Sequence, residues 1–189
     1  MGNQERRILM SGASGLIGSA LHRAAQSQGC AITTLVRRHH LVRPGTIYWN
    51  PRRGNFATHP AELEGFDAMV HLSGANVGQR WTNKYKEEIV ASRVASTEKL
   101  CESLAGVRRR PRVLLCASAI GIYGDRGDEV LTEESAAGEG FLAETCKAWE
   151  SAANKASELG IRVVHLRFGV VLSHDGGALK KMLPALSST

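Results

Sequence analysis

Short apolar runs alternate along this chain with longer segments in which apolar residues recur at helical spacing. The runs of strand length lie at residues 8–10, 31–36, 46–50, 68–72, 111–119 and 161–169, and the third is the weakest of them. The longest helical patterns cover residues 82–104 and 141–159, and a glycine follows shortly after each. This alternation, with strands that are apolar throughout, predicts an α/β fold: a doubly wound parallel sheet with helices on both faces.

The composition is that of an ordinary soluble protein, with 43% hydrophobic and 22% charged residues among 189. No apolar run reaches the roughly 18 residues of a membrane span, and the first ten residues carry no apolar stretch of signal-peptide length. We therefore expect a cytoplasmic protein that has no membrane partner.

Cysteine spacing and charge exclude further classes. Cys30, Cys101, Cys116 and Cys146 form no Cys-x-x-Cys pair, so neither a metal site nor a disulfide framework is expected. The net charge of +6 is spread over short basic pairs without interleaved aromatic residues, which argues against a nucleic-acid partner. Nucleic-acid binding through the pairs near Arg37 and at residues 108–110 is kept as a rival interpretation.

The stretch RILMSGASGLIGSAL places three glycines at intervals of three between a strand and a helix. In that context Gly12 permits a tight turn, Gly15 lets the backbone approach a pyrophosphate, and Gly18 lets the helix pack against the sheet. The helix amino terminus then offers N–H groups and a partial positive charge to phosphates. The pattern predicts a dinucleotide-binding loop.

The second strand ends in LVRRHH, where an NAD-specific site would carry Asp or Glu for the ribose 2′-hydroxyl. Arg37 and Arg38 are suited instead to a 2′-phosphate, which favours NADP over NAD. The alternative is a solvated pair of arginines in a loop. Because ligands of doubly wound sheets bind at the carboxyl ends of the strands, Gly12, Arg37, Ser73 and residues 117–119 are expected to gather at one edge.

Five blocks, SGASGLIG, DAMVHLSGANV, RWTNKYKEEIVASRVAST, ASAIGIYGDRGDEVLTEES and LRFGVVLSHDGGAL, resemble extended short-chain dehydrogenase/reductases of the epimerase/dehydratase type. The chain is most similar to their atypical subgroup, described as nucleoside-diphosphate-sugar epimerases or cell-division inhibitors. The resemblance implies a Rossmann-type domain with a nicotinamide cofactor. The cofactor contacts that it implies are Gly12, Gly15, Leu16, Ile17, Arg37, Leu72, Ser73, Gly74, Glu88, Arg93 and Arg167. A solvated helix charge is the alternative for Glu88 and for Arg93, and a structural salt bridge is the alternative for Arg167.

The wider family uses a tyrosine four residues before a lysine as general acid/base, and here the pattern fails. Lys147 is preceded at that distance by Ala143, and a shift of one residue offers only Leu142. Tyr123 belongs to a different block. Ser118 is expected to contact substrate or nicotinamide, and Lys147 the nicotinamide ribose. The alternatives are a buried serine bonded to backbone and a lysine on an exposed helix face. His71 is expected to be a core histidine with its hydrogen bonds satisfied.

Relatives of this type continue with a smaller carboxyl-terminal domain that completes the substrate pocket. Residues 1–189 are therefore expected to form one NAD(P)-binding domain without its substrate domain. Apolar surface left open would favour self-association. The function predicted from the sequence is NADP-dependent hydride transfer on a hydroxyl or carbonyl carbon of a small molecule, which a sugar nucleotide would fit. The alternative is a catalytically silent NADP-binding sensor or protein-interaction module.

Overall fold

The computed structural model describes residues 5–51, 55–56 and 60–186. Its centre is a seven-stranded sheet of order β4-β3-β2-β1-β5-β6-β7, in which only the β3–β4 pair is antiparallel. The strands are β1 (Arg7–Ser11), β2 (Ala31–Val36), β3 (Thr46–Asn50), β4 (Asn55–Phe56), β5 (Ala68–His71), β6 (Val113–Ala119) and β7 (Arg162–Phe168). The predicted doubly wound, Rossmann-type parallel sheet is confirmed.

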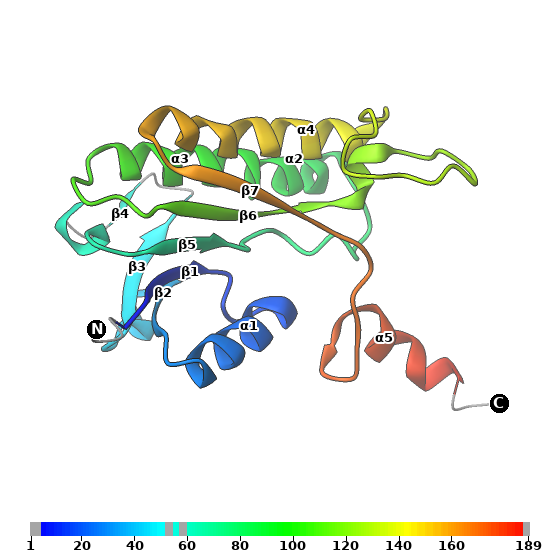
Figure 1. The fold of residues 1–189 in the computed structure, drawn as a ribbon. Coiled ribbons are helices and arrows are strands. Elements are labelled where there is room, and N and C mark those ends of the chain that lie inside the picture. Colours follow the sequence, from blue (N-terminus) through cyan, green and yellow to red (C-terminus); the bar gives the residue numbers. More distant parts are fainter. Residues whose placement is uncertain (1–4, 52–54, 57–59, 187–189) are drawn as a thin grey trace.

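Helices cover both faces of the sheet, as expected (Figure 1). On one face lies α1 (Leu16–Ser27), and on the other lie α2 (Asn83–Ala91), α3 (Val94–Ala105) and α4 (Phe141–Asn154). After β7 the chain makes the short strand β8 (Leu172–Ser173) and the helix α5 (Gly177–Leu186) on the α1 side. The first residue of α5 contacts α1, because a Cβ on Gly177 would come within 3.1 Å of the Leu16 side chain.

The single helix expected over residues 82–104 is wrong: the segment forms two helices, α2 and α3, separated at Ser92 and Arg93. At the break, side chains bond groups outside the regular helical ladder. The Ser92 hydroxyl accepts from the Ala75 N–H at 2.9 Å, and the Arg93 guanidinium donates to the carbonyls of Ile89 and Ala75. Such side-chain competition bends or interrupts helices while the apolar stripe continues, so periodicity alone does not predict it.

The main core lies between the sheet and the pair α3 and α4. It joins Leu9, Met69 and Leu114 of the central strands to Leu100 of α3 and Trp149 of α4. Three of the four cysteines are buried as free thiols, and burial raises the pKa of Cys101 to about 11 and that of Cys116 to about 12. These thiols are therefore protonated and unreactive at neutral pH.

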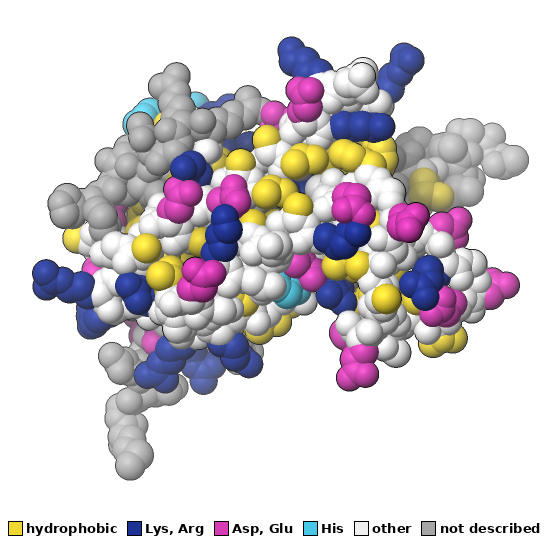
Figure 2. Space-filling model, turned by 90° about the horizontal axis from the view of Figure 1, so that it is seen from above, with side chains coloured by type: hydrophobic (Ala, Val, Ile, Leu, Met, Phe, Trp, Pro, Cys, Tyr) yellow, Lys and Arg dark blue, Asp and Glu magenta, His cyan; other side chains and the backbone are white. Residues whose placement is uncertain are grey.

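Seen from above, the face formed by α2, α3 and α4 mixes charges of both signs with a band of apolar side chains (Figure 2). A hollow of about 450 Å³ opens on this face. Its lining residues are Lys86, Glu87, Val90, Ala91, Val94, Ala95, Glu98 and Phe141. None of the helices in the described part of the chain combines the length and the apolar character needed to cross a membrane.

Candidate functional site

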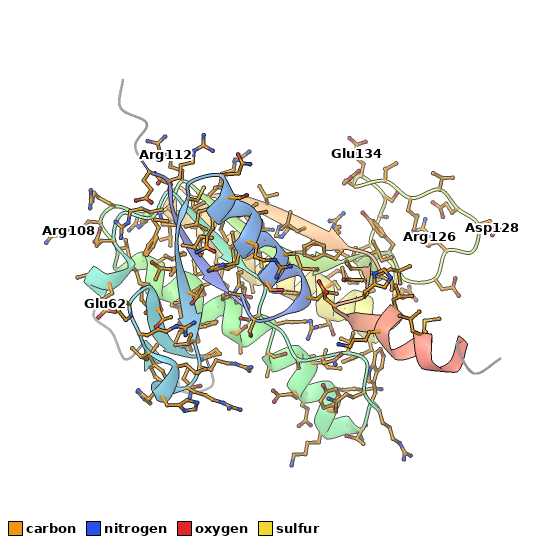
Figure 3. The ribbon with its side chains drawn as sticks, turned by 90° about the horizontal axis from the view of Figure 1, so that it is seen from below. Glu62, Arg108, Arg112, Arg126, Asp128 and Glu134 are labelled. Carbon is orange, nitrogen blue, oxygen red and sulfur yellow. The ribbon has the colours of Figure 1, made fainter. Side chains whose placement is uncertain are left out.

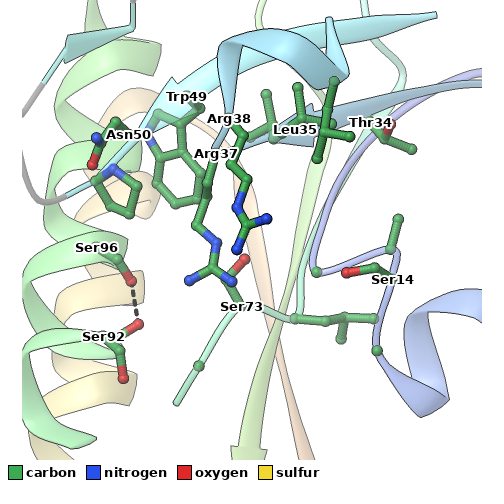
Figure 4. A pocket seen from close by; sticks show the side chains of 18 of the residues that line it. Ser14, Thr34, Leu35, Arg37, Arg38, Trp49, Asn50, Ser73, Ser92 and Ser96 are labelled. Carbon is green, nitrogen blue, oxygen red and sulfur yellow. Dashed lines mark hydrogen bonds between the residues drawn. The ribbon is translucent and has the colours of Figure 1, made fainter. Parts of the chain in front are cut away.

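A cleft of about 1870 Å³ lies at the carboxyl edge of the sheet beside β1, where the strand order reverses between β2 and β5. Residues of the glycine loop, the end of β2, the end of β5 and the wall formed by α2 and α3 line it (Figure 4). Of the predicted cofactor residues, eight line the cleft: Gly12, Gly15, Arg37, Arg38, Leu72, Ser73, Gly74 and Glu88. The structure thus brings three of the four predicted strand ends together; the end of β6, with Ser118, lies outside this lining.

The glycine loop is built by close backbone contacts. Gly12 has φ +72°, and a Cβ there would lie 2.7 Å from the Leu72 carbonyl. A Cβ on Gly18 would lie 2.2 Å from the Gly12 oxygen, which in turn accepts the Gly15 N–H at 3.0 Å. Gly15 is the N-cap of α1 and lines the cleft, so the start of this helix faces the cleft as an anion site requires. Leu16 and Ile17 form the first turn of α1 and do not line the cleft.

Arg37 and Arg38 follow the last residue of β2, and both side chains reach into the cleft (Figure 4). The loop that carries them is ordered by a short 3₁₀ turn (His39–Leu41) and by the His39 ring, which stacks on Tyr48 with centroids 3.7 Å apart. In the part of the chain that the structure describes, no ion pair involves either arginine. The loop therefore presents two cationic groups to an anionic ligand.

The wall opposite α1 contains residues that the sequence patterns did not predict. Trp49 and Asn50 at the end of β3 line it together with Ser92 and Ser96 (Figure 4). Lys99 also belongs to the lining. Trp49 is 1% exposed and belongs to the core, so its apolar character gave no signal of a site. Helical spacing from Glu88 gave no signal for Ser96 and Lys99 either, because the break at Ser92 and Arg93 places Glu88 on α2 and these two residues on α3.

Arg93 lies behind this wall. Its guanidinium sits 3.2 Å from where a Cβ of Gly74 would be, donates to Ala75 O at 3.0 Å and lies over the Trp149 ring at 5.2 Å. Burial lowers the pKa of its guanidinium, which still stays charged at neutral pH. In this structure the residue therefore holds the backbone of the β5–α2 loop, and the absence of a side chain at Gly74 makes room for it.

Ser118, Glu150 and Arg167 form one buried network at the carboxyl ends of β6 and β7. The Ser118 hydroxyl donates to Glu150 Oε1 at 2.6 Å, and Arg167 donates to both Glu150 oxygens at 2.9 Å. Arg167 also donates to the Tyr123 hydroxyl at 2.8 Å. Burial opposes ionisation of Glu150, but the hydrogen bonds from Arg167 and Ser118 outweigh it and hold its pKa below the usual range.

This network changes what Ser118 and Arg167 can do. A serine hydroxyl can donate one hydrogen bond, and Glu150 accepts it, so in this state Ser118 can only accept a hydrogen bond from a ligand. Arg167 forms a salt bridge with Glu150, as the alternative to a cofactor contact predicted. The hydrogen bonds to Glu150 raise the already high pKa of the Arg167 guanidinium. Neither side chain lines the cleft.

The remaining predicted residue, Lys147, pairs with Glu144 one turn earlier on the partly exposed side of α4 and does not line the cleft. The two positions where a catalytic tyrosine was sought hold Leu142, which is 38% exposed, and Ala143, which is buried. Neither side chain carries a phenol. Among the described residues, no three His, Cys, Asp or Glu side chains gather as a metal site would require.

His71 lies at the end of β5, close to the glycine loop. Its Nδ1 is 2.7 Å from the Ser11 hydroxyl, which also accepts the Leu72 N–H at 3.2 Å. Its Nε2 is buried without a hydrogen-bond partner, so the expected core histidine has only half of its hydrogen-bonding capacity satisfied. Burial lowers the pKa of His71 to about 4 and keeps the ring neutral at neutral pH.

A family model named NAD dependent epimerase/dehydratase family matches residues 8–188, nearly the whole chain. The chain belongs to this family. Its glycine loop and the basic end of β2 line one cleft at the carboxyl edge of the sheet. The epimerase/dehydratase family thus accounts for the fold, whereas the side chains on α4 differ from the catalytic pattern expected for it.

Relatives in the epimerase/dehydratase family are longer than this chain. It is 41% identical over 183 residues to Epimerase family protein Mb2239 of Mycobacterium bovis, a match covering 95% of this chain and 58% of that protein. Among solved structures, the nucleoside-diphosphate sugar epimerase from Corynebacterium glutamicum is 38% identical with a TM-score of 0.83, and the match covers 98% of this chain and 38% of that one. Human epimerase family protein SDR39U1, solved with NADPH, is 27% identical with a TM-score of 0.78, and the match covers 94% of this chain and 58% of that one.

Proposed function

We propose that this chain binds NADP in the cleft and serves hydride transfer on a hydroxyl or carbonyl carbon of a small molecule. The observation that carries the choice of NADP is the pair Arg37 and Arg38, which reach into the cleft where an NAD site would have a carboxylate. The human relative solved with NADPH supports the same choice.

The residues fit such a cofactor. A Cβ on Gly12 or Gly18 would collide with backbone, so glycine there permits the tight turn and the close packing of α1, and Gly15 at the start of α1 lines the cleft where a pyrophosphate would accept backbone N–H groups. Arg37 and Arg38 would hold the 2′-phosphate through charge-assisted hydrogen bonds. Ser73 and Gly74 would border the ligand at the end of β5. When bound, the nicotinamide ring supplies or accepts the hydride.

Calorimetric titration of the 189-residue chain with NADPH and separately with NADH tests the cofactor. Because a 2′-phosphate adds charge-assisted bonds, we expect NADPH to bind at least about tenfold more tightly. The double substitution Arg37→Asp with Arg38→Ala should reduce that ratio. Arg108→Asp with Arg109→Ala is the matched control, because these arginines lie between α3 and β6 and do not line the cleft. Figure 3 labels Arg108. An unchanged ratio in the Arg37 variant, or equal binding of both dinucleotides, would contradict the assignment.

A catalytically silent NADP-binding module is the second candidate, and it has its own observation. The expected tyrosine is absent, and the Ser118 proton is committed to Glu150. Incubation of the chain with NADP⁺ and a panel of sugar nucleotides, followed by nicotinamide absorbance, separates the two candidates. Formation of NADPH with any member supports hydride transfer, whereas tight binding with no turnover supports the silent module.

A further inference from the structure

The cleft is larger than one small-molecule site needs. Its volume of about 1870 Å³ exceeds the roughly 300–1,000 Å³ usual for such pockets. It wraps around the carboxyl ends of β1 and β2 and reaches both faces of the sheet. Leu35 belongs to the core shared with α3, and its neighbour Thr34 points to the opposite face because successive strand residues alternate, yet both line the cleft.

The part on the α1 face is here called the α1-side lobe and is defined by His22, Arg23, Thr34, Arg43 and Thr46. Its chemistry differs from that of the α3 side. The α3 side offers an indole, an amide and small side chains at Trp49, Asn50 and Ser96, whereas the α1-side lobe offers two guanidinium groups and no carboxylate. Such a lobe suits an anionic group rather than a nucleobase.

The cleft as a whole concentrates positive charge. Its charged lining residues are Arg23, Arg37, Arg38, Arg43, Lys99 and the single carboxylate Glu88. Lys99 is paired with Glu102 at 2.7 Å, but no ion pair within the described residues holds Arg23 or Arg43. Like charges held together destabilise the compact state, and a bound anion relieves their repulsion. If Arg37 and Arg38 serve a 2′-phosphate, Arg23 and Arg43 are left for another anion.

Both arginines stand on ordered elements. Arg43 opens a turn in which the Thr46 N–H donates to its carbonyl at 2.9 Å and its own N–H donates to the Thr46 hydroxyl at 2.7 Å. Pro44 and the positive φ of Gly45, +79°, fit the second and third positions of a type II turn. Arg23 belongs to the third turn of α1. Because the backbone at both arginines is already ordered, binding an anion costs little backbone freedom.

We propose that the α1-side lobe is a second phosphate-binding site, in which Arg23 and Arg43 hold a phosphate monoester or inorganic phosphate while a dinucleotide occupies the rest of the cleft. That a dinucleotide occupies the rest of the cleft rests on the proposed function. That the α1-side lobe binds phosphate rests only on its lining residues and their charge.

Titration of inorganic phosphate into the 189-residue chain saturated with NADPH, followed by phosphorus NMR, tests the proposal. We expect a saturable signal that Arg23→Gln with Arg43→Gln weakens by about tenfold or more, since each charge-assisted contact is strong. Arg112→Gln with Arg162→Gln is the matched control; both arginines are exposed at the amino ends of β6 and β7, away from the cleft. Glycerol phosphate in a parallel titration shows whether the lobe prefers an ester or the free ion.

Three results would overturn the proposal. Phosphate that binds the NADH-saturated chain but is excluded by NADPH would make the lobe part of the 2′-phosphate site. If the control pair weakened phosphate binding equally, the loss of affinity would come from the lower net charge and not from the lobe. A signal that never saturates would mean that no site exists. If NADPH itself fails to bind, the proposed function fails, and the same titration of the free chain still tests the lobe.

Discussion

At the scale of single residues, Gly18 couples the first helix to the glycine loop. A methyl group there would lie 2.2 Å from the Gly12 oxygen, so backbone must move. We expect Gly18→Ala to lower the free energy of unfolding by about 1–3 kcal/mol, as overpacking does, and to weaken NADPH binding. Gly169→Ala is the control, because its methyl would meet only the Ile120 side chain at 3.7 Å. Urea unfolding and calorimetry of both variants test this, and equal stabilities would refute the argument.

His71 makes stability depend on pH at the same scale. Its pKa is about 4 in the folded chain against 6.5 for a free histidine, so between these values the unfolded state binds more protons. Stability is therefore lost as pH falls from 6.5 toward 4, and we expect about 2 kcal/mol to disappear by about pH 5. Urea unfolding at several pH values tests this. His71→Gln has no such proton to take up, so a wild-type loss that persists unchanged in this variant would exclude His71 as its source.

At the scale of elements, Glu150 ties α4 to β6 and β7 through Ser118 and Arg167. Its side chain is 11% exposed and that of Arg167 is 23% exposed, so removing the charge leaves a largely buried guanidinium unpaired. We expect Glu150→Gln to lower the free energy of unfolding by about 2 kcal/mol. Glu144→Gln on the same helix breaks the exposed pair with Lys147 and should cost less than about 0.5 kcal/mol. Thermal unfolding that ranks the two variants equally would contradict this role.

The sequence predicted elements where periodicity determines structure. The six parallel strands and the Gly12 turn follow from apolar runs and from glycine spacing. The break at Ser92 and Arg93 does not, because it depends on hydrogen bonds to Ala75, seventeen and eighteen residues earlier. The hydrogen bond that Ser118 donates to Glu150 depends likewise on a contact across thirty-two positions. Side-chain partners at such separations are set by tertiary packing, which local patterns do not contain.

At the scale of the whole molecule, β7 forms an edge of the sheet and pairs only with β6 among the described residues. After β7 the chain runs on toward β8 with apolar side chains on the surface, since Val170 is 73% and Leu172 63% exposed. An unpaired strand edge and an exposed apolar segment both favour association, so we expect the chain to self-associate as its concentration rises.

Sedimentation velocity over a range of concentrations tests this expectation. Val170→Glu with Leu172→Glu should shift the chain toward monomer. Val130→Glu should not, because Val130, although 89% exposed, lies between Asp128 and Glu134 on a loop that projects away from the sheet (Figure 3). A wild-type chain that sediments as a monomer at every concentration would show that neither the β7 edge nor the apolar segment after it drives self-association.

Trp49 gives the cleft an optical property. It is one of three tryptophans, and it alone combines near-complete burial with a place in the cleft lining, edge-on to the His71 ring at 5.7 Å. Trp81 is 38% exposed on the loop before α2, and Trp149 lies under Arg93. A shielded indole beside a ligand emits strongly until the ligand quenches it, so the intrinsic fluorescence of the unlabelled chain should report directly on how much of the cleft is filled.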